Sequence, residues 1–143
     1  MSKEELIKKA VEYREKAYAP YSKFKVGAAV EGESGRIYGG CNVENSSYGM
    51  TICAERAAIV KAVSEGETKI VRMAVVTVDK DVSLPCGACR QVLLEFGREA
   101  EVYCCDTEGN CKEYSARDLI PHFDNSNVFR KNLDELRRKD GLE

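Results

Sequence analysis

The sequence predicts an α/β fold with three layers, in which a mixed five-stranded sheet lies between helices. Two observations support this prediction. Segments whose apolar residues recur at helical spacing alternate along the chain with short segments rich in β-branched residues, as expected for a sheet covered by helices on both faces. The chain of 143 residues has the length of one domain, and no repeat or low-complexity stretch divides it. We therefore expect a single domain over residues 1–143.

The first predicted element is an amphipathic helix. Ser2 and Glu5 have the spacing of a capping box, which predicts a helix that begins there and ends before Pro20. Alternating apolar residues then predict a hairpin of two strands, over 24–30 and 37–43. Two consecutive glycines in the second strand indicate a bulge or the close approach of another backbone; they are Gly39 and Gly40.

The middle of the chain predicts two buried helices around a central strand. Residues 53–64 are apolar almost all round and are followed by Gly66, which predicts a buried helix that ends there. Residues 70–78 are rich in β-branched side chains and predict the strand, and Pro85 opens the second helix, over 86–96. The remaining predicted elements are strands over 102–105 and 111–114, a helical turn after Ser115, and a terminal helix over 128–139 within a C-terminal extension, 124–143.

Charge and hydropathy limit the classes of partner. The formal net charge is −2 at pH 7, so the chain lacks the basic excess that is typical of proteins that bind nucleic acid. No run of about 18 apolar residues is present to cross a membrane. The N-terminal residues also lack the apolar stretch of a signal peptide. We therefore expect a cytoplasmic protein with a small-molecule partner, and neither a nucleic acid nor a membrane.

The cysteines predict a metal site. The chain has seven cysteines and one histidine, and in a reducing compartment a metal site or free buried thiols are expected before disulfides. Cys86 and Cys89 are three residues apart in a predicted helix, so both side chains lie on one face and can bind one metal ion. Cys53, at the start of the other buried helix, is a candidate third ligand. Three protein ligands leave one position open for water, which is the pattern of a catalytic zinc site.

A glutamate follows the first of these cysteines. Glu55 lies two residues after Cys53, close enough to reach the water without binding the metal. A ligand, one residue and a glutamate, followed later by Pro-Cys-x-x-Cys, form the signature of zinc-dependent deaminases. The second part of this signature is present at Pro85–Cys89. We therefore predict one Zn²⁺ per chain, with Glu55 as the catalytic group that moves protons.

Two arginines adjoin the predicted ligands. Three thiolates around one Zn²⁺ leave a net negative charge, which weakens the metal as a Lewis acid unless charge is drawn off the sulfurs. The N-termini of the two helices are expected to do this, together with Arg56 and Arg90 as second-shell partners of the thiolates. We predict that Arg56 tunes the zinc and does not contact the substrate.

A structural zinc site is the main alternative at this point. Its fourth ligand would be Cys41, Cys104 or Cys111. Cys104 and Cys105 are consecutive on a predicted strand, so their side chains point to opposite faces. We expect the four cysteines outside the predicted cluster to be small core residues with free thiols. His122 has no partner pattern and is expected at a surface or an interface.

Four motifs of the chain occur together in one known family; they are Phe24–Ala29, Asn42–Tyr48, Thr51–Arg56 and Pro85–Gln91. Through them, and from about Glu5 to Phe123, the chain resembles the small homotetrameric cytidine deaminases. The resemblance implies a cytidine deaminase-like fold, a homotetramer with active sites shared between subunits, and hydrolytic deamination of free cytidine and 2′-deoxycytidine, with release of ammonia, in pyrimidine salvage. Members of the family usually end soon after the position of Phe123, whereas this chain continues to Glu143.

The same resemblance implies roles for single residues. It makes the three predicted cysteines the zinc ligands and Glu55 the proton shuttle. It makes Asn42 and Glu44 ribose ligands, chiefly of the 3′-hydroxyl; residues two apart at a strand end project to the same side. Phe24, beside the base, and Phe123, from a neighbouring subunit, are also implied substrate contacts, for which the alternative is ordinary packing in the core. The other implied substrate contacts are Ala54 and Tyr48.

Three other functions are weighed against this one. Deaminases of blasticidin-type nucleoside antibiotics share the Cys-Ala-Glu and Pro-Cys-Gly-x-Cys patterns, but Asn42, Glu44 and Phe24 favour a simple nucleoside. An editor of RNA or DNA is disfavoured by the acidic balance and the lack of a basic, aromatic stretch. A zinc module that only binds partners leaves Glu55 without a role.

Overall fold

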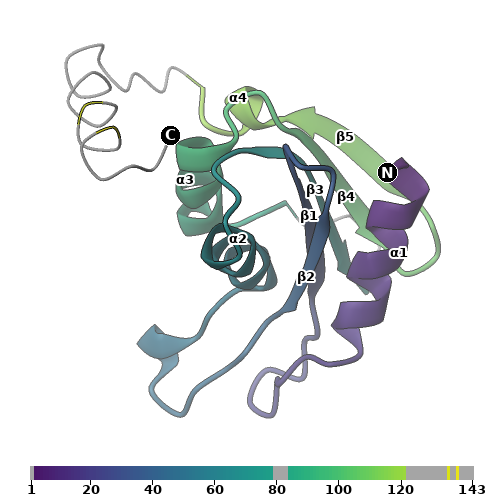
Figure 1. Ribbon diagram of the computed structural model, residues 1–143. Helices are drawn as coiled ribbons and strands as arrows, with labels where there is room; N and C mark the ends of the chain where they lie inside the picture. The colour runs from purple at the N-terminus through teal and green to yellow at the C-terminus, as the bar shows by residue number, and fades with distance from the viewer. Residues whose placement is uncertain (1, 79–83, 122–134, 136–137, 139–143) are drawn as a thin grey trace.

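A five-stranded sheet with the order β2-β1-β3-β4-β5 forms the middle layer of the molecule (Figure 1). The structure is a computed structural model that describes residues 2–78, 84–121, 135 and 138. Strands β3 and β4 are parallel, whereas the other neighbouring strands are antiparallel, so the prediction of a mixed sheet is confirmed. The strands are β1 (Gly27–Gly32), β2 (Ile37–Cys41), β3 (Ile70–Thr77), β4 (Glu101–Asp106) and β5 (Cys111–Ser115).

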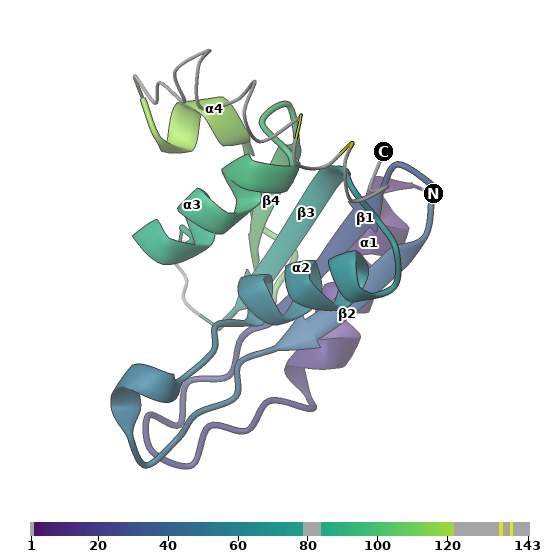
Figure 2. The ribbon, with the colours of Figure 1, turned by 60° about the vertical axis from the view of Figure 1, so that its left-hand side comes forward.

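Helices cover both faces of the sheet. Helix α1 (Lys3–Arg14) packs on one face, against β1, β2 and β3. Helices α2 (Ala54–Ser64) and α3 (Gly87–Phe96) lie side by side on the other face (Figure 2). The predicted three-layer α/β/α architecture is therefore confirmed. Two short helices complete the described part, η1 (Tyr48–Met50) and α4 (Ala116–Leu119).

The core consists of two apolar clusters, one on each side of the sheet. Successive side chains of a strand point to opposite faces, so neighbours in sequence enter different clusters. Ala28 and Val30 of β1 pack with α2, whereas Ala29 packs with α1. Cys104 and Cys105 of β4 divide in the same way, as predicted.

Gly40 explains how α2 is held against the sheet. A Cβ atom on Gly40 would lie 2.5 Å from the backbone nitrogen of Ala58 and 2.8 Å from the carbonyl oxygen of Ala54. Only a glycine allows the backbones of β2 and α2 to come this close. The predicted close approach is confirmed, and it places the N-terminus of α2 beside the end of β2.

Several boundaries differ from the predictions. Helix α1 begins as expected, with Ser2 Oγ accepting from the Glu5 amide at 3.2 Å, but it already ends at Arg14. The first strand begins only at Gly27, and the second ends at Cys41. Helix α2 is not buried all round, because Val60 is 53% exposed.

Two further expectations concern the chain as a whole. The predicted terminal helix over 128–139 and the extension over 124–143 lie outside the described residues, apart from positions 135 and 138. No helix of the described part is long and apolar enough to cross a membrane.

The expectation of free thiols is wrong for two cysteines. Cys105 and Cys111 form a disulfide, with 4.1 Å between their Cα atoms. The β4–β5 hairpin places these two residues directly opposite each other, so no backbone movement is needed to join the sulfurs. The expectation of free thiols came from the reducing compartment alone, which says nothing about which residues of a hairpin lie opposite each other. Cys41 and Cys104 have free thiols.

Candidate active site

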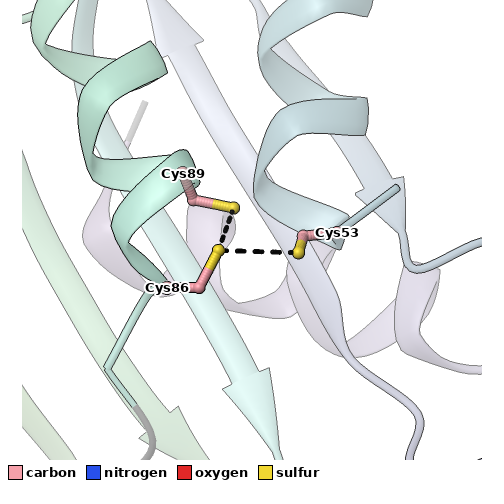
Figure 3. A group of neighbouring side chains, drawn as sticks. All are labelled: Cys53, Cys86 and Cys89. Carbon is pink, nitrogen blue, oxygen red and sulfur yellow. Dashed lines mark hydrogen bonds between the residues drawn. The ribbon is translucent and has the colours of Figure 1, made fainter. Parts of the chain in front are cut away.

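Three cysteines meet where two helices begin. Cys53 is the N-cap of α2, Cys86 is the N-cap of α3, and Cys89 lies in the first turn of α3. Their sulfur atoms point toward one another (Figure 3) and all lie within 4.8 Å of one another. Cys53 Sγ is 3.7 Å from Cys86 Sγ, which is 3.4 Å from Cys89 Sγ. As predicted, Cys86 and Cys89 lie on one face of the helix, and Cys53 lies close to both.

The cluster fits a zinc ion. Zn–S bonds of about 2.3 Å in a tetrahedron place sulfur atoms about 3.8 Å apart, close to the separations in the cluster. Among the described residues, Cys53, Cys86 and Cys89 form the one group of this kind, so a structural site with a fourth cysteine is not supported. Cys111 is in the disulfide and therefore has no free thiolate to offer.

Arg56 contacts the cluster directly. Its Nη2 atom donates to Cys53 Sγ at 3.5 Å. The hydrogen bond from Cys89 lowers the pKa of Cys53 to about 5, and the Arg56 guanidinium acts in the same direction. These contacts therefore favour a negatively charged sulfur at Cys53. This is the contact that the tuning hypothesis requires of Arg56, and the tuning itself stays a prediction.

Within the described part of the chain, Arg90 donates its hydrogen bonds to backbone carbonyls and not to a sulfur. Its Nε donates to the carbonyl oxygen of Pro85 at 2.8 Å, and its Nη1 donates to that of Leu119 at 2.9 Å. These bonds tie the segment before α3 to the end of α4. Successive residues of a helix point about 100° apart, so adjacency to Cys89 does not by itself direct Arg90 at a sulfur, and its second-shell role stays a prediction.

Glu55 is buried beside the cysteines. It is the second residue of α2 and is only 5% exposed. Burial raises the pKa of the Glu55 carboxyl, and the negative charge on Cys53 raises it further. A carboxyl whose pKa is raised holds a proton more readily than an ordinary one, which suits a group that must accept a proton and return it.

A cavity of about 270 Å³ connects this corner with the end of β2. It is close to the lower end of the usual range for small-molecule sites, about 300–1,000 Å³. Six residues singled out from the sequence line it, and its walls are mainly apolar. The full lining is Ser22, Phe24, Val26, Asn42, Glu44, Thr51, Cys53, Ala54, Glu55, Val75, Thr77 and Leu84.

Asn42 and Glu44 hold the segment that precedes β1. Asn42 Oδ1 accepts from the Val26 amide at 2.9 Å, and its Nδ2 donates to the Phe24 carbonyl at 2.8 Å. Glu44 Oε1 accepts from the backbone amides of Tyr21 and Ser22, at 3.0 and 3.1 Å. Phe24 is 37% exposed at the cavity wall, so it is not an ordinary core residue in this chain.

Tyr48, a predicted substrate contact, does not line this cavity. Tyr48 lies on η1, is 75% exposed, and lines a neighbouring cavity of about 410 Å³. Its ring makes an edge-on contact with Tyr21, with 5.9 Å between centroids. Phe123 and His122 lie outside the described residues.

Sequence reasoning missed some of the cavity wall. Ser22 is the most polar of these residues and precedes Phe24 by two positions, which was the available signal. The others come from separate elements and have no shared spacing; they are Val26, Thr51, Val75, Thr77 and Leu84.

Comparisons with known proteins agree on one family. The sequence profile of the "cytidine and deoxycytidylate deaminase zinc-binding region" matches residues 1–105. A cytidine deaminase of Sporosarcina psychrophila is 48% identical over 122 residues, covering 85% of this chain and 90% of the relative. One from Halalkalibacterium halodurans is 46% identical over 122 residues, covering 85% of this chain and 92% of the relative.

Solved structures give the same result. The crystal structure of cytidine deaminase from Burkholderia pseudomallei has a TM-score of 0.83 at 46% identity and covers 85% of this chain and 98% of that one. That of Mycobacterium tuberculosis has a TM-score of 0.72 at 39% identity and covers 85% of this chain and 96% of that one. The match to the family profile over residues 1–105 spans the three cysteines of the cluster.

Proposed function

The chain belongs to the cytidine and deoxycytidylate deaminase family, and we propose that it deaminates cytidine and 2′-deoxycytidine with Glu55 as the group that moves the protons. The observation that best supports this role is the position of Glu55. It is buried in the cavity wall two residues from Cys53, in a corner where three cysteine sulfurs fit one Zn²⁺.

The zinc site has three protein ligands. Cys53, Cys86 and Cys89 would hold the ion, which when bound supplies a Lewis acid that makes water a nucleophile near neutral pH. The remaining chemistry belongs to Glu55. Its carboxylate accepts a proton from the attacking water and passes it to N3 of the pyrimidine, which activates C4 for attack. After the water oxygen has bonded to C4, the same carboxylate takes the remaining proton of the new hydroxyl group and gives it to the amino group. The C4–N bond then breaks, ammonia leaves, a C4 carbonyl forms, and the first proton stays on N3.

The cavity walls orient the nucleoside for this chemistry. We assign the ribose to Asn42 and Glu44 at one end and the base to the apolar walls, with Phe24 and Ala54 beside it. The apolar walls exclude water, so the hydrogen bonds of the reacting groups are stronger than they would be in solution. The alternative substrate, a blasticidin-type antibiotic, is not favoured, because the relatives described above are cytidine deaminases.

The test of Glu55 is the Glu55→Gln variant. We expect it to retain one zinc per chain, measured by mass spectrometry of the metal. Its turnover of cytidine, followed by loss of absorbance, should fall by at least about 100-fold, the usual range for a lost general acid–base. Glu67→Gln is the matched control, because Glu67 is similarly buried, 7% against 5% exposed, but does not line the cavity. Ordinary activity in Glu55→Gln would contradict the mechanism.

We further propose that the protein is a homotetramer whose active sites are shared between subunits. Tyr48 and Met50 are 75% and 64% exposed on η1, an element with no buried residue. Large apolar side chains at such exposure favour burial against another molecule. Tyr48 lines the cavity next to the one that holds Glu55, so a subunit seated there would lie close to the substrate.

Native mass spectrometry tests the assembly. We expect the wild type to be tetrameric, and Met50→Glu to shift it toward smaller species with reduced cytidine turnover. Val60→Glu is the control, since Val60 is also exposed, at 53%, but lies on α2 and lines neither cavity. A wild-type monomer with full activity would contradict shared sites. A role in cytoplasmic pyrimidine salvage belongs to the same proposal.

A further inference from the structure

The hydroxyl of Ser22 links two residues of the substrate cavity. Ser22 Oγ donates to Glu44 Oε2 and accepts from the backbone amide of Phe24 at 3.0 Å. The other carboxylate oxygen of Glu44 accepts from the amides of Tyr21 and Ser22. Both oxygens of Glu44 are therefore held, and the plane of the carboxylate is set by the Ser22 hydroxyl.

These contacts limit what Glu44 can still accept. An ionised carboxylate has about four lone-pair positions. Within the described part of the chain, the amides of Tyr21 and Ser22 and the Ser22 hydroxyl use three of them. The hydrogen bond from Ser22 also lowers the pKa of Glu44, so the group is an ionised acceptor near neutral pH. One acceptor position remains, on Oε2.

Asn42 offers the complementary group. Its Nδ2 has two hydrogens, of which one is donated to the Phe24 carbonyl at 2.8 Å. Its Oδ1 already accepts from Val26 at 2.9 Å. One acceptor from Glu44 and one donor from Asn42, both in the cavity wall, match a single hydroxyl, which donates once and accepts at its oxygen.

The same local arrangement occurs at a second place, away from the cavity. Ser34 donates its amide at 3.3 Å and its hydroxyl to Glu67, and its Oγ accepts from the Arg36 amide at 3.2 Å. The middle residue there is Gly35, with a φ of 89°.

In the cavity copy the middle residue is Lys23, with a φ of 61°, a conformation that a side chain with a Cβ disfavours. A positive φ is ordinary for Gly35, whereas it is unfavourable for Lys23 in the turn beside the cavity. Strain of this kind is concentrated at functional sites.

We propose that Ser22 is a positioning residue that orients Glu44 so that the Asn42–Glu44 pair accepts one sugar hydroxyl. The inference rests on the proposed role of Glu44 in ribose binding. It means that the pair takes the 3′-hydroxyl alone and has no further acceptor for a second hydroxyl, so cytidine and 2′-deoxycytidine are treated alike at this place.

The experiment compares two substrates in the holoenzyme. The value of kcat/KM is measured for 2′-deoxycytidine and for 2′,3′-dideoxycytidine, which lacks the 3′-hydroxyl, and their ratio reports recognition of that hydroxyl. We expect Ser22→Ala to lower the ratio about tenfold, mainly through KM, as for the weakening of one hydrogen bond to a charged group. Ser22→Thr keeps the hydroxyl and should restore the ratio.

Ser34→Ala is the matched control, because it removes the equivalent hydroxyl from Glu67 and should leave the ratio unchanged. Equal loss of kcat/KM on both substrates in Ser22→Ala would show that the serine only supports the loop, which overturns the proposal. A wild-type ratio close to one would instead overturn the role of Glu44 in ribose binding, and the Ser22 proposal with it. Zinc content and thermal unfolding establish that each variant is folded.

Discussion

Arg56 Nη2 lies 3.5 Å from Cys53 Sγ and donates to it, which joins a guanidinium to a predicted zinc ligand within one turn of α2. The Nε atom of Arg56 is buried and has no hydrogen-bond partner among the described residues. The Nη2 end of the side chain is thus directed at the cysteine cluster, and Arg56 does not line the substrate cavity. Replacing Arg56 should therefore change the properties of the metal site and leave substrate binding largely unaffected.

Replacing Arg56 with alanine should lower kcat more than it raises KM. Partners that hydrogen-bond a metal ligand usually contribute about 10–100-fold to activity or metal affinity. We expect a fall in kcat of about tenfold or more, with a change in the KM for cytidine of less than about threefold. A variant that loses only affinity for cytidine would contradict the tuning hypothesis.

Removing a predicted ligand should release the metal. Cys86→Ala leaves two of the three sulfurs, too few for a stable site, so we expect the purified protein to contain less than one zinc per chain and to lack turnover. Cys104→Ala is the control, because Cys104 is fully buried but outside the cluster. Retention of zinc by Cys86→Ala would contradict the ligand assignment.

Glu67 should make stability fall in acid. Burial raises the pKa of Glu67, but the hydrogen bonds from Ser34 and Tyr38 lower it more, so it lies below the ordinary value of 4.5. A lowered pKa in the folded state stabilises the protein above the unfolded value, and this contribution is lost as the pH falls through the folded value. The advantage in Tm of the wild type over Glu67→Gln should therefore shrink below about pH 4.5. A difference that stays constant with pH would contradict the assignment.

The Cys105–Cys111 disulfide should contribute to stability and not to catalysis. It closes a short loop, for which chain entropy predicts about 2 kcal/mol of unfolding free energy. Both residues pack in the cluster on the α1 side of the sheet, whereas the cysteine cluster lies at the N-termini of α2 and α3. Denaturation with a phosphine reductant should show the loss, and Cys111→Ser should be insensitive to it. A large loss of kcat on reduction would contradict this separation.

Lys23→Gly should stabilise the fold. Lys23 has a φ of 61°, which costs a residue with a Cβ roughly 1–2 kcal/mol and costs glycine little. Glycine has more conformational entropy in the unfolded state, which offsets part of this benefit. We therefore expect the free energy of unfolding to rise by about 1 kcal/mol, measured by chemical denaturation. Lys25→Gly is the control, since Lys25 does not have a positive φ, and it should destabilise. A loss of stability in Lys23→Gly would contradict the strain.

Apart from the short helix η1, the sequence predicted the order and type of the described elements, because each depends on local spacing. Boundaries differed where a distant side chain decides them. Phe24–Val26 alternates like a strand, yet the Asn42 side chain occupies the Phe24 carbonyl and the Val26 amide. Neighbouring strands cannot use these groups, and β1 begins at Gly27.

The candidate site followed the same rule. Cys86 and Cys89 were accessible from helical spacing, and Cys53 and Glu55 from the deaminase pattern. Adjacency in sequence does not give the direction of a side chain, and the Arg90 donors go to the carbonyl oxygens of Pro85 and Leu119, so its effect on the thiolates stays a prediction. The disulfide depended on the hairpin register, which residue types alone do not determine.

The position of the three sulfurs makes metal supply part of the folding equilibrium. Cys53 and Cys86 are 33 residues apart in the sequence, and strand β3 lies between them along the chain. One bound ion would therefore link the N-terminus of α2 to that of α3. The unfolded chain has no such preformed site, so binding stabilises the native state by an amount that grows with the logarithm of free zinc. In a zinc-starved cell the chain would therefore unfold and be degraded more readily. The amount of folded protein would then depend on the supply of zinc, whether or not a nucleoside is present.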